Sequence, residues 1–219
     1  MQLKRKKAIN WHKVSASKKK LEVSFLMQHK DNLNWHIISY NQKLSESTIE
    51  LFLDKVNWTN ISSHQKLSYE FIVKHQDKIN FYTLASNKHL NQKTIILFKD
   101  KLNFHDVCIN NRLTENTILA VQDRIIYWNV LITNQNLTEK LIDMFIDKFE
   151  WYDIWYYGRL SEKFMVKYIK YIDWDCIVYR QKLSKKFILK YWNNLDVNLL
   201  QKYQHLDPEI KEYLTLFKG

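Results

Sequence analysis

Glycine and proline are almost absent from this sequence of 219 residues, which contains two glycines, Gly158 and Gly219, and one proline, Pro208. Average usage is roughly 7% for glycine and 5% for proline. Because glycine supplies the positive φ angles of tight hairpins and phosphate-binding loops, its scarcity excludes Gly-rich nucleotide loops and many-stranded sandwiches. Both residues interrupt helices, so the chain is expected to be mostly helical.

Cysteines and long apolar runs are scarce as well. Cys108 and Cys176 are the two cysteines, and their separation fits no metal-binding motif, which indicates a reducing compartment. No run of roughly 18 or more apolar residues is present. The basic start of the chain leads into polar residues instead of the apolar segment of a signal peptide. We therefore expect a non-secreted protein without a membrane span.

Acidic residues are missing from the first twenty positions, which hold eight of the 34 basic residues. The rest of the chain carries 26 basic and 23 acidic residues, a net charge of only +3. We expect residues 1–8 to form a basic tail. The basic cluster could bind nucleic acid, an anionic membrane surface or an acidic protein, or it could be a solvated tail, and KRKK at 4–7 also resembles a nuclear localisation signal. The candidates for binding nucleic acid here are Lys4, Arg5, Lys6, Lys7, Lys18, Lys19 and Lys20.

A period of 23 residues runs through the sequence. Leucine recurs at this spacing, with one step of 24, at positions 21, 44, 67, 90, 113, 137, 160, 183 and 206. A large aromatic residue recurs at 11, 35, 58, 81, 104, 128, 151 and 174, and an aliphatic residue follows each of them three positions later. The extra residue falls between Leu113 and Trp128, in the stretch 124–127. Features that repeat in phase predict stacked equivalent units.

Each copy is expected to form two short helices, because its apolar residues are spaced three and four apart. Residues that favour helix N-caps follow the leucines: Ser45, Ser68, Asn91, Thr114, Thr138, Ser161, Ser184 and Asp207. Pro208 comes next in its copy, at the first helical position, which proline tolerates. Acids at the same position suit the helix dipole: Glu46, Glu115, Glu139 and Glu162.

The second helix of a copy is predicted to begin after an Asn or Asp that precedes the aromatic residue, as at Asn57 and Asp173. We expect it to end about two turns later in a left-handed residue, near Asn41, His64, Asn87, Asn110 or Asn134. Isolated helices below about 12 residues are marginal in water, so neighbouring copies must hold them. The recurring aromatic residue is interpreted as core, and a base-stacking ladder is the weaker alternative.

These patterns together predict an all-α solenoid of nine short helix-pair repeats with a period of 23 residues. Half copies should cap it at both ends, from Ile9 to Ser15 and from Leu206 to Phe217. We expect residues 9–219 to form a single helical-repeat domain.

The repeat consensus, roughly LSExFIxxxxDKxxWxxIxxxQK, resembles short repeats in proteins of unknown function from giant DNA viruses of the mimivirus and marseillevirus kind. The copies nearest to it are LSYEFIVKHQDKINF at 67–81 and LSEKFMVKYIKYIDW at 160–174, and the resemblance covers Ile9 to Phe217. It implies a viral origin and a helical-repeat fold but no activity. With that origin, the protein is expected in the host cytoplasm or the virion, with the nucleus as an alternative.

Residues suited to catalysis or metal binding do not gather in the sequence. The eight histidines fall at different positions of the copies, and neighbouring copies about 10 Å apart cannot share one metal ion. Aspartates that recur ten residues after the leucine fit solvated helix ends or ion pairs better than paired catalytic carboxylates. They are Asp31, Asp54, Asp77, Asp100, Asp123 and Asp147. We expect no enzyme activity, no catalytic or metal site and no cofactor.

A basic residue precedes most of the repeat leucines. These residues are Lys20, Lys43, Lys66, Arg112, Arg159 and Lys182, and histidines stand at 89 and 205. Each should lie near a helix C-terminus, where the dipole favours a cation without any ligand. Stacking would also align them into a stripe that could follow the phosphates of a nucleic acid.

Tyrosine is concentrated at the other end of the chain. WYDIWYYG at 151–158 places Trp155, Tyr156 and Tyr157 where other copies have Ser62 and Ser63, and Tyr179 and Tyr203 take comparable positions. Aromatic residues at normally polar positions suggest an exposed protein-binding patch, and the alternative is a larger core. We therefore expect a non-enzymatic protein-interaction scaffold, either a structural viral protein or one that binds a host protein. The alternative is a nucleic-acid-binding protein that uses the basic residues.

Overall fold

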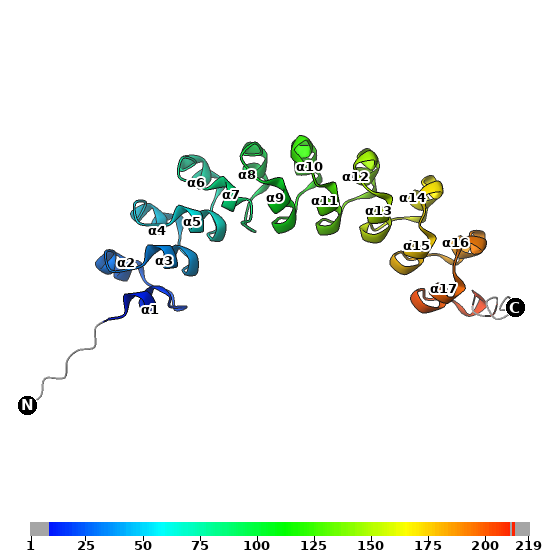
Figure 1. The fold of residues 1–219 in the computed structure, drawn as a ribbon, viewed down its shortest axis with the longest axis horizontal. Helices are drawn as coiled ribbons and strands as arrows, with labels where there is room; N and C mark the ends of the chain where they lie inside the picture. Colours follow the sequence, from blue (N-terminus) through cyan, green and yellow to red (C-terminus); the bar gives the residue numbers. More distant parts are fainter. Residues whose placement is uncertain (1–8, 211, 213–219) are drawn as a thin grey trace, which may run out of the picture. The chain divides into compact units, whose positions relative to one another are not determined.

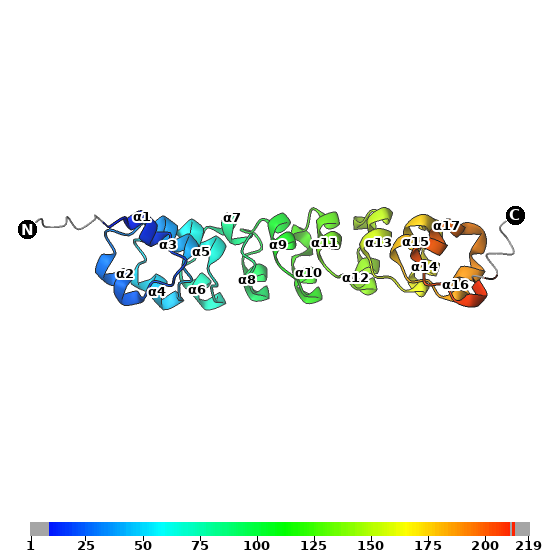
Figure 2. The ribbon, with the colours of Figure 1, turned by 90° about the horizontal axis from the view of Figure 1, so that it is seen from below.

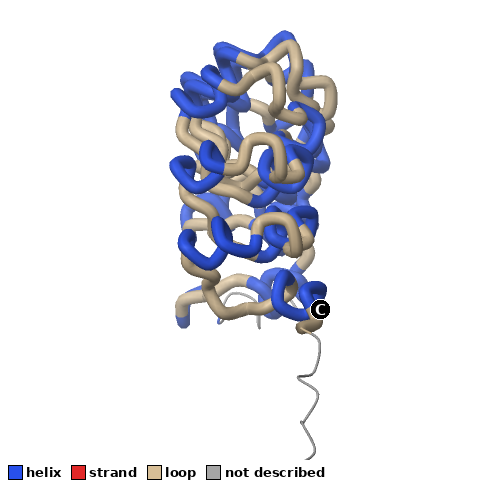
Figure 3. Tube along the Cα trace, turned by 90° about the vertical axis from the view of Figure 1, so that its left-hand side faces the viewer, coloured by secondary structure: helices blue, strands red, loops and turns tan. Residues whose placement is uncertain are grey.

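A computed structural model describes residues 9–210 and 212, and these residues form helices and loops without any strand (Figure 3). The predicted α-helical solenoid is thus confirmed. The chain divides into two compact units, Met1–Ile126 (unit 1) and Tyr127–Gly219 (unit 2). The boundary falls at the stretch that contains the one extra residue of the repeat.

The helices of unit 1 are α1 (Trp11–Ser15), α2 (Val23–His29), α3 (Trp35–Asn41), α4 (Glu46–Leu51), α5 (Trp58–His64), α6 (Tyr69–Lys74), α7 (Phe81–Leu84), α8 (Gln92–Leu97), α9 (Phe104–Asn110), α10 (Glu115–Val121) and the 3-10 segment η1 (Gln122–Arg124). Those of unit 2 are α11 (Trp128–Asn134), α12 (Glu139–Met144), η2 (Ile146–Lys148), α13 (Trp151–Tyr157), α14 (Glu162–Lys167), η3 (Ile169–Tyr171), α15 (Trp174–Arg180), α16 (Lys185–Lys190), η4 (Trp192–Asn194) and α17 (Val197–Tyr203). A further helical stretch begins at Pro208, as predicted.

Within each unit the helices stand in two rows (Figures 1 and 2). Odd-numbered helices pack on one another in sequence, as α3 packs on α5 and α13 on α15. Even-numbered helices form the second row, in which α8 contacts α10. None of these α-helices exceeds seven residues, so each depends on its neighbours for stability.

Two columns of apolar side chains form the core. The aliphatic residue at the fourth position of the odd-numbered helices is half-buried in the first copy, at Val14, and fully buried, with 0% exposure, at Ile38, Ile61, Leu84, Val107, Leu131, Ile154, Ile177 and Leu200. A second column lies five positions after the leucines, on the even-numbered helices, with at most 2% exposure at Leu26, Ile49, Ile72, Ile95, Ile118, Ile142, Met165 and Ile188. Burial of one such side chain stabilises the fold by about 1.5 to 3 kcal/mol.

The repeat aromatic residues also pack in the core. Trp35 is 7% exposed, and its indole Nε1 donates to the carbonyl of Lys30 at 2.7 Å. Trp58 is half-buried and donates to the carbonyl of Leu53 at 3.1 Å. These two indole N–H groups therefore hold the turn that precedes each helix, and the structure confirms that the aromatic residues pack in the core.

The predicted N-caps are in place. The side chain of Ser45 accepts from the N–H of Thr48, and the equivalent bonds form at the caps from Ser68 to Asp207. Asn34 and its equivalents cap the odd-numbered helices in the same way, except at Tyr127 and Glu150.

The predicted left-handed helix ends are wrong. No non-glycine residue in the described part of the chain has a positive φ. The C-cap Gln42 is extended, with φ −90° and ψ 141°, and so is Gln65. A glutamine side chain replaces the left-handed turn, because it reaches back to the preceding copy and satisfies main-chain groups there.

This link between copies, which we call the glutamine staple, repeats through the chain. Gln65 Nε2 donates to the carbonyls of Ser39 and Gln42, and its Oε1 accepts from the N–H of Leu44. The equivalent amides that make two such carbonyl bonds are Gln42, Asn87, Gln181 and Gln204. Each staple joins groups 21 to 26 residues apart, so only stacking brings them together.

Candidate functional site

Five tyrosines on α13, α15 and α17 form a continuous row, the tyrosine row: Tyr152, Tyr156, Tyr157, Tyr179 and Tyr203. The ring centroids of Tyr156 and Tyr179, which lie one copy apart, are 6.3 Å from each other, and those of Tyr179 and Tyr203 are 4.7 Å apart. Tyr152 is 56% exposed and Tyr179 is 47% exposed, whereas Tyr156 is half-buried. The row is therefore a large, partly solvent-exposed aromatic surface.

Trp155 does not belong to this surface, which corrects the sequence prediction. Its side chain is 0% exposed, stacks on Trp151 at 5.7 Å and donates from Nε1 to the carbonyl of Tyr171 at 2.7 Å. The equivalent Ser62 is itself fully buried, and its Oγ accepts from the N–H of Asn80. The position therefore faces the next copy, and a polar residue there does not indicate exposure.

Arg180 lies over the tyrosine row. Its guanidinium carbon is 4.3 Å from the ring centroid of Tyr156 and 5.7 Å from that of Tyr179, and its Nε donates to the carbonyl of Tyr156 at 2.8 Å. A cation on the face of an aromatic ring is attracted by the ring quadrupole. Because Tyr156 also stacks on Tyr152, the ring faces of Tyr156 are largely covered. The exposed parts of Tyr152, Tyr157, Tyr179 and Tyr203 remain for a partner.

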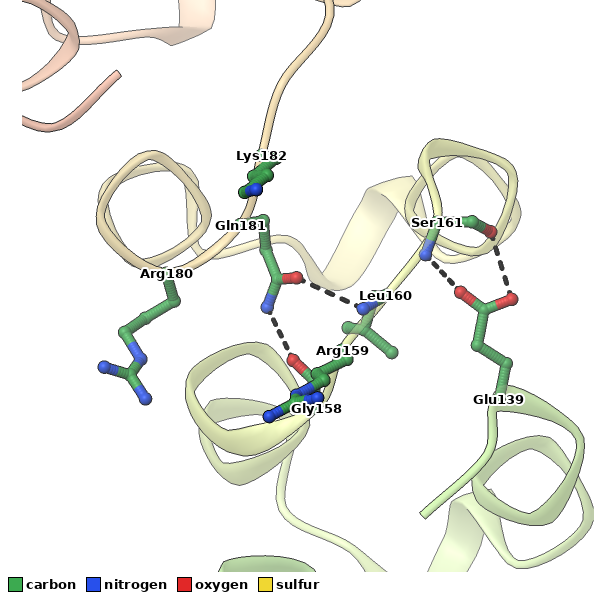
Figure 4. A pocket seen from close by; sticks show the side chains of 8 residues that line it. All are labelled: Glu139, Gly158, Arg159, Leu160, Ser161, Arg180, Gln181 and Lys182. Carbon is green, nitrogen blue, oxygen red and sulfur yellow. Dashed lines mark hydrogen bonds between the residues drawn. The ribbon is translucent and has the colours of Figure 1, made fainter. Parts of the chain in front are cut away.

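A cavity of about 680 Å³ shares Arg180 with the row, and Figure 4 shows the residues that line it. Its lining residues are Glu139, Gly158, Arg159, Leu160, Ser161, Arg180, Gln181 and Lys182. Gln181 bonds to the carbonyl of Gly158 and the N–H of Leu160, and Glu139 accepts from the N–H and Oγ of Ser161. The neutral and acidic groups of the wall are thus engaged within the protein. Arg180 donates from Nε to the carbonyl of Tyr156, whereas Arg159 and Lys182 form no ion pair within the described residues.

Gly158 occupies a position that carries glutamine in several other copies. A Cβ on Gly158 would lie 2.5 Å from the carbonyl oxygen of Ile154 and 3.1 Å from the side chain of Leu160. The backbone therefore approaches too closely for any other residue. This glycine is a further signal in the sequence that marks the cavity, beside Arg159 and Lys182 of the basic stripe, and sequence reasoning did not use it.

The predicted basic stripe is exposed and lies where expected. Lys43, Lys66, Arg112, Arg159 and Lys182 each follow directly after the C-cap of an odd-numbered helix. Within the described residues these five cations form no ion pair, whereas Lys20 lies 3.7 Å from Glu22. Unit 1 has its own cavity of about 410 Å³ beside its part of the stripe, lined by Lys43, Lys88 and His89 among others.

The N-terminal basic candidates are described only in part. Lys4, Arg5, Lys6 and Lys7 lie outside the described residues. Lys18, Lys19 and Lys20 are exposed in the connector before α2.

The aspartates that recur in the copies mostly form ion pairs. Asp31 pairs with Lys55 at 2.9 Å, Asp123 pairs with Lys99 at 2.9 Å, and Asp100 pairs with Arg124. The hydrogen bond from Lys55 lowers the pKa of Asp31, and that from Lys99 lowers the pKa of Asp123. Groups held ionised in this way are poor proton donors near neutral pH.

The two thiols and the imidazole of His75 are buried in the protein. Burial raises the pKa of Cys108 to about 12 and that of Cys176 to about 11, which suppresses the reactive thiolate. His75 is buried against Phe71, with its Nε2 3.3 Å from Glu50. Across the described residues, no three His, Cys, Asp or Glu side chains are placed to hold a metal ion. No described helix has the length and apolar character needed to cross a bilayer.

Comparison of the chain with protein-family models, curated proteins and solved structures gave no match. Function is therefore inferred from the surfaces described above.

Proposed function

We propose that the protein is a non-enzymatic interaction module that binds a partner protein through the tyrosine row. The single observation that supports this proposal is the row itself, five contiguous tyrosines of which four are at least 39% exposed. Tyrosine and arginine are the residues that most often anchor protein interfaces, and the row combines both. Four partly exposed aromatic side chains offer a partner protein both apolar and polar contacts.

The alternative is a nucleic-acid-binding protein, and the exposed, unpaired cations of the basic stripe favour it. Two features place it second. The net charge after residue 20 is only +3, and many cations outside the stripe are neutralised by carboxylates of a neighbouring copy, as Lys74 is by Glu50. The faces of Tyr156, the ring at the centre of the row, are already occupied by Arg180 and Tyr152 and so are not open to a base.

The resemblance of the repeat to giant-virus proteins supports a viral origin for this module, in an infected cell or a virion. The periodic fold is consistent with that proposal but common to repeat proteins of many kinds.

Peptide display on the full chain tests the proposal. Peptides selected on the wild-type protein should bind a Tyr156→Ser/Tyr179→Ser variant at least about tenfold more weakly, because these rings are the expected anchors. The matched control is Tyr40→Ser/Tyr82→Ser, which removes two exposed tyrosines of unit 1. Circular dichroism should show that both variants stay folded. Equal binding by both variants, or a failure to select any peptide, would remove the tyrosine row as a protein-binding surface.

A further inference from the structure

The cavity beside the tyrosine row and the row itself share Arg180. Its guanidinium group lies over Tyr156 and Tyr179, and the same side chain forms one wall of the cavity (Figure 4). A single ligand chain that covers the rings would therefore reach the cavity without a gap. The chemistry of the cavity then specifies what that chain must carry.

The cavity is positively charged. Arg159, Arg180 and Lys182 form no ion pair within the described residues. The acid in the wall, Glu139, already accepts two hydrogen bonds from Ser161. Three cations therefore line the wall with one carboxylate, whose oxygens already accept hydrogen bonds, and one of these cations, Arg180, also donates from Nε to the carbonyl of Tyr156.

The hydrogen-bonding capacity of the cavity points the same way. Arginine and lysine side chains offer donors only. The wall carbonyl of Gly158 accepts from Gln181, and the side-chain oxygen of Gln181 accepts from Leu160. A ligand that fits must supply acceptors, and an anionic acceptor forms the stronger, charge-assisted bonds.

We infer that the segment bound on the tyrosine row is an acidic, extended stretch of a partner protein whose carboxylates enter this cavity and bind Arg159, Arg180 and Lys182. The inference rests on the proposed function and specifies the chemistry of the partner. Arg159 and Lys182 occupy equivalent positions one copy apart, and packed helices are spaced by about 8 to 10 Å. A chain in the extended polyproline II conformation has three residues per turn and rises about 3.1 Å per residue, so it covers that distance in one turn and returns to the same face. Carboxylates at every third position would therefore meet successive copies, while the side chains between them contact the tyrosines.

A defined probe tests this inference. The probe is a fluorescent peptide of about 12 residues, long enough to span several copies, with Asp at every third position and Tyr and Ser between. It is titrated with the full chain and followed by anisotropy. A matched peptide with Asn in place of Asp has the same shape without charge. We expect the Asp peptide to bind about tenfold more tightly than the Asn peptide, with an advantage that shrinks in high salt.

Substitutions locate the site. Arg159→Gln/Lys182→Gln should weaken binding of the Asp peptide roughly three- to tenfold. Both side chains are exposed and form no ion pair within the described residues, so both are expected to pair with carboxylates of the peptide. The control Lys163→Gln/Lys186→Gln removes two exposed lysines around a different cavity, beside α14 and α16, and should leave binding unchanged.

Three outcomes would overturn the inference. The Asn peptide could bind as tightly as the Asp peptide, or the control variant could weaken binding as much as Arg159→Gln/Lys182→Gln. Alternatively, an oligo-dT of about the same length could bind more tightly than the Asp peptide and depend on the same two residues, which would make the cavity a phosphate site. If display-selected neutral peptides still require Tyr156 and Tyr179, the proposed function survives and only the acidic partner is lost.

Discussion

The side-chain amide of Gln65 donates to the main-chain carbonyl of Gln42, the equivalent glutamine of the preceding copy, at 2.8 Å. Gln204 is joined to Gln181 in the same way at 2.7 Å. The side chain that ends one odd-numbered helix therefore holds the end of the previous one. Within each unit, these bonds fix the register of the stack beside the basic stripe.

Gln65→Met should destabilise unit 1 by about 2 to 4 kcal/mol, because it leaves two carbonyls and the N–H of Leu44 buried without their partner. Gln65 is 4% exposed, and methionine fills a similar volume. Urea unfolding measures the change in the free energy of unfolding. Faster hydrogen exchange at the N–H of Leu44 would report the loss of its bond to Gln65. The control Gln76→Met changes an exposed glutamine and should have little effect. Unchanged exchange at Leu44 would show that the staple is not a stabilising link.

Trp155→Ser should cost about 3 to 5 kcal/mol of unfolding free energy, since it empties a fully buried site. Tyr157→Ser, two residues away and 40% exposed, should stay within about 0.5 kcal/mol. Thermal or urea unfolding of unit 2 measures the loss of stability in the Trp155→Ser and Tyr157→Ser variants. Similar small effects of both substitutions would place Trp155 at the surface, against the structure.

Glu46→Ala should cost about 1 to 2 kcal/mol, because the carboxylate of Glu46 accepts from the N–H and Oγ of Ser68 in the next copy at 2.5 and 3.1 Å. Glu70, in the first turn of α6, is exposed and has no such bond, so Glu70→Ala should cost only about a few tenths of a kcal/mol. The difference in urea midpoint between the two variants measures the link between copies. Equal urea midpoints for the two variants would show that Glu46 stabilises the protein only through the helix dipole, and not through its bonds to Ser68.

Stability should fall in acid. Hydrogen bonds from Lys55, Lys74 and Lys167 lower the pKa values of Asp31, Glu50 and Asp143. A carboxyl group with a lowered folded-state pKa contributes stability above its unfolded pKa, here 3.8 for aspartate, and loses it as the pH falls through the folded value. The melting temperature should therefore decline below about pH 4, and less so in high salt.

Asp31→Asn should flatten this acid dependence more than Asp54→Asn does, because Asp54 forms no ion pair in the described chain. Melting curves of both variants between about pH 6 and 2.5 make the comparison. If the melting temperature of both variants fell equally with pH, the ion pair between Asp31 and Lys55 would not contribute to the acid dependence.

The helices and their order could be predicted because their signals are local. A cap such as Ser45 bonds to an N–H three residues away, and Trp35 and Ile38, three residues apart on one helix, are both buried. The paired helices of a copy follow from these two local signals, the N-cap residue and the three-residue spacing of buried side chains.

The glutamine staples and the bonds from Ser68 to Glu46 of the preceding copy could not be predicted. Their partners are 21 to 26 residues apart in the sequence and become neighbours only when copies stack. The glutamine appears in the repeat pattern, but its role depends on the position of carbonyls in another copy. Helix-capping preferences predicted a left-handed residue at the end of the helix. In the structure, a glutamine side chain from the next copy bonds to the carbonyl groups there instead.

The candidate site was predicted in part. Tyrosines at 156, 157, 179 and 203 do form one surface, while Trp155 is buried because its position faces a neighbouring copy. The sequence pointed to a polar, exposed position there, since Ser39 and Ser62 occupy it elsewhere. These serines are buried too, and each uses its Oγ to cap the next copy.

Amide hydrogen exchange of the full chain, with and without a display-selected peptide, would locate the binding surface without any substitution. Binding on the tyrosine row predicts new protection in residues 152–160 and 179–182, with α14, α16 and residues 18–20 unchanged. Protection confined to residues 18–20 or to the even-numbered helices, with none around Tyr156 and Tyr179, would contradict it.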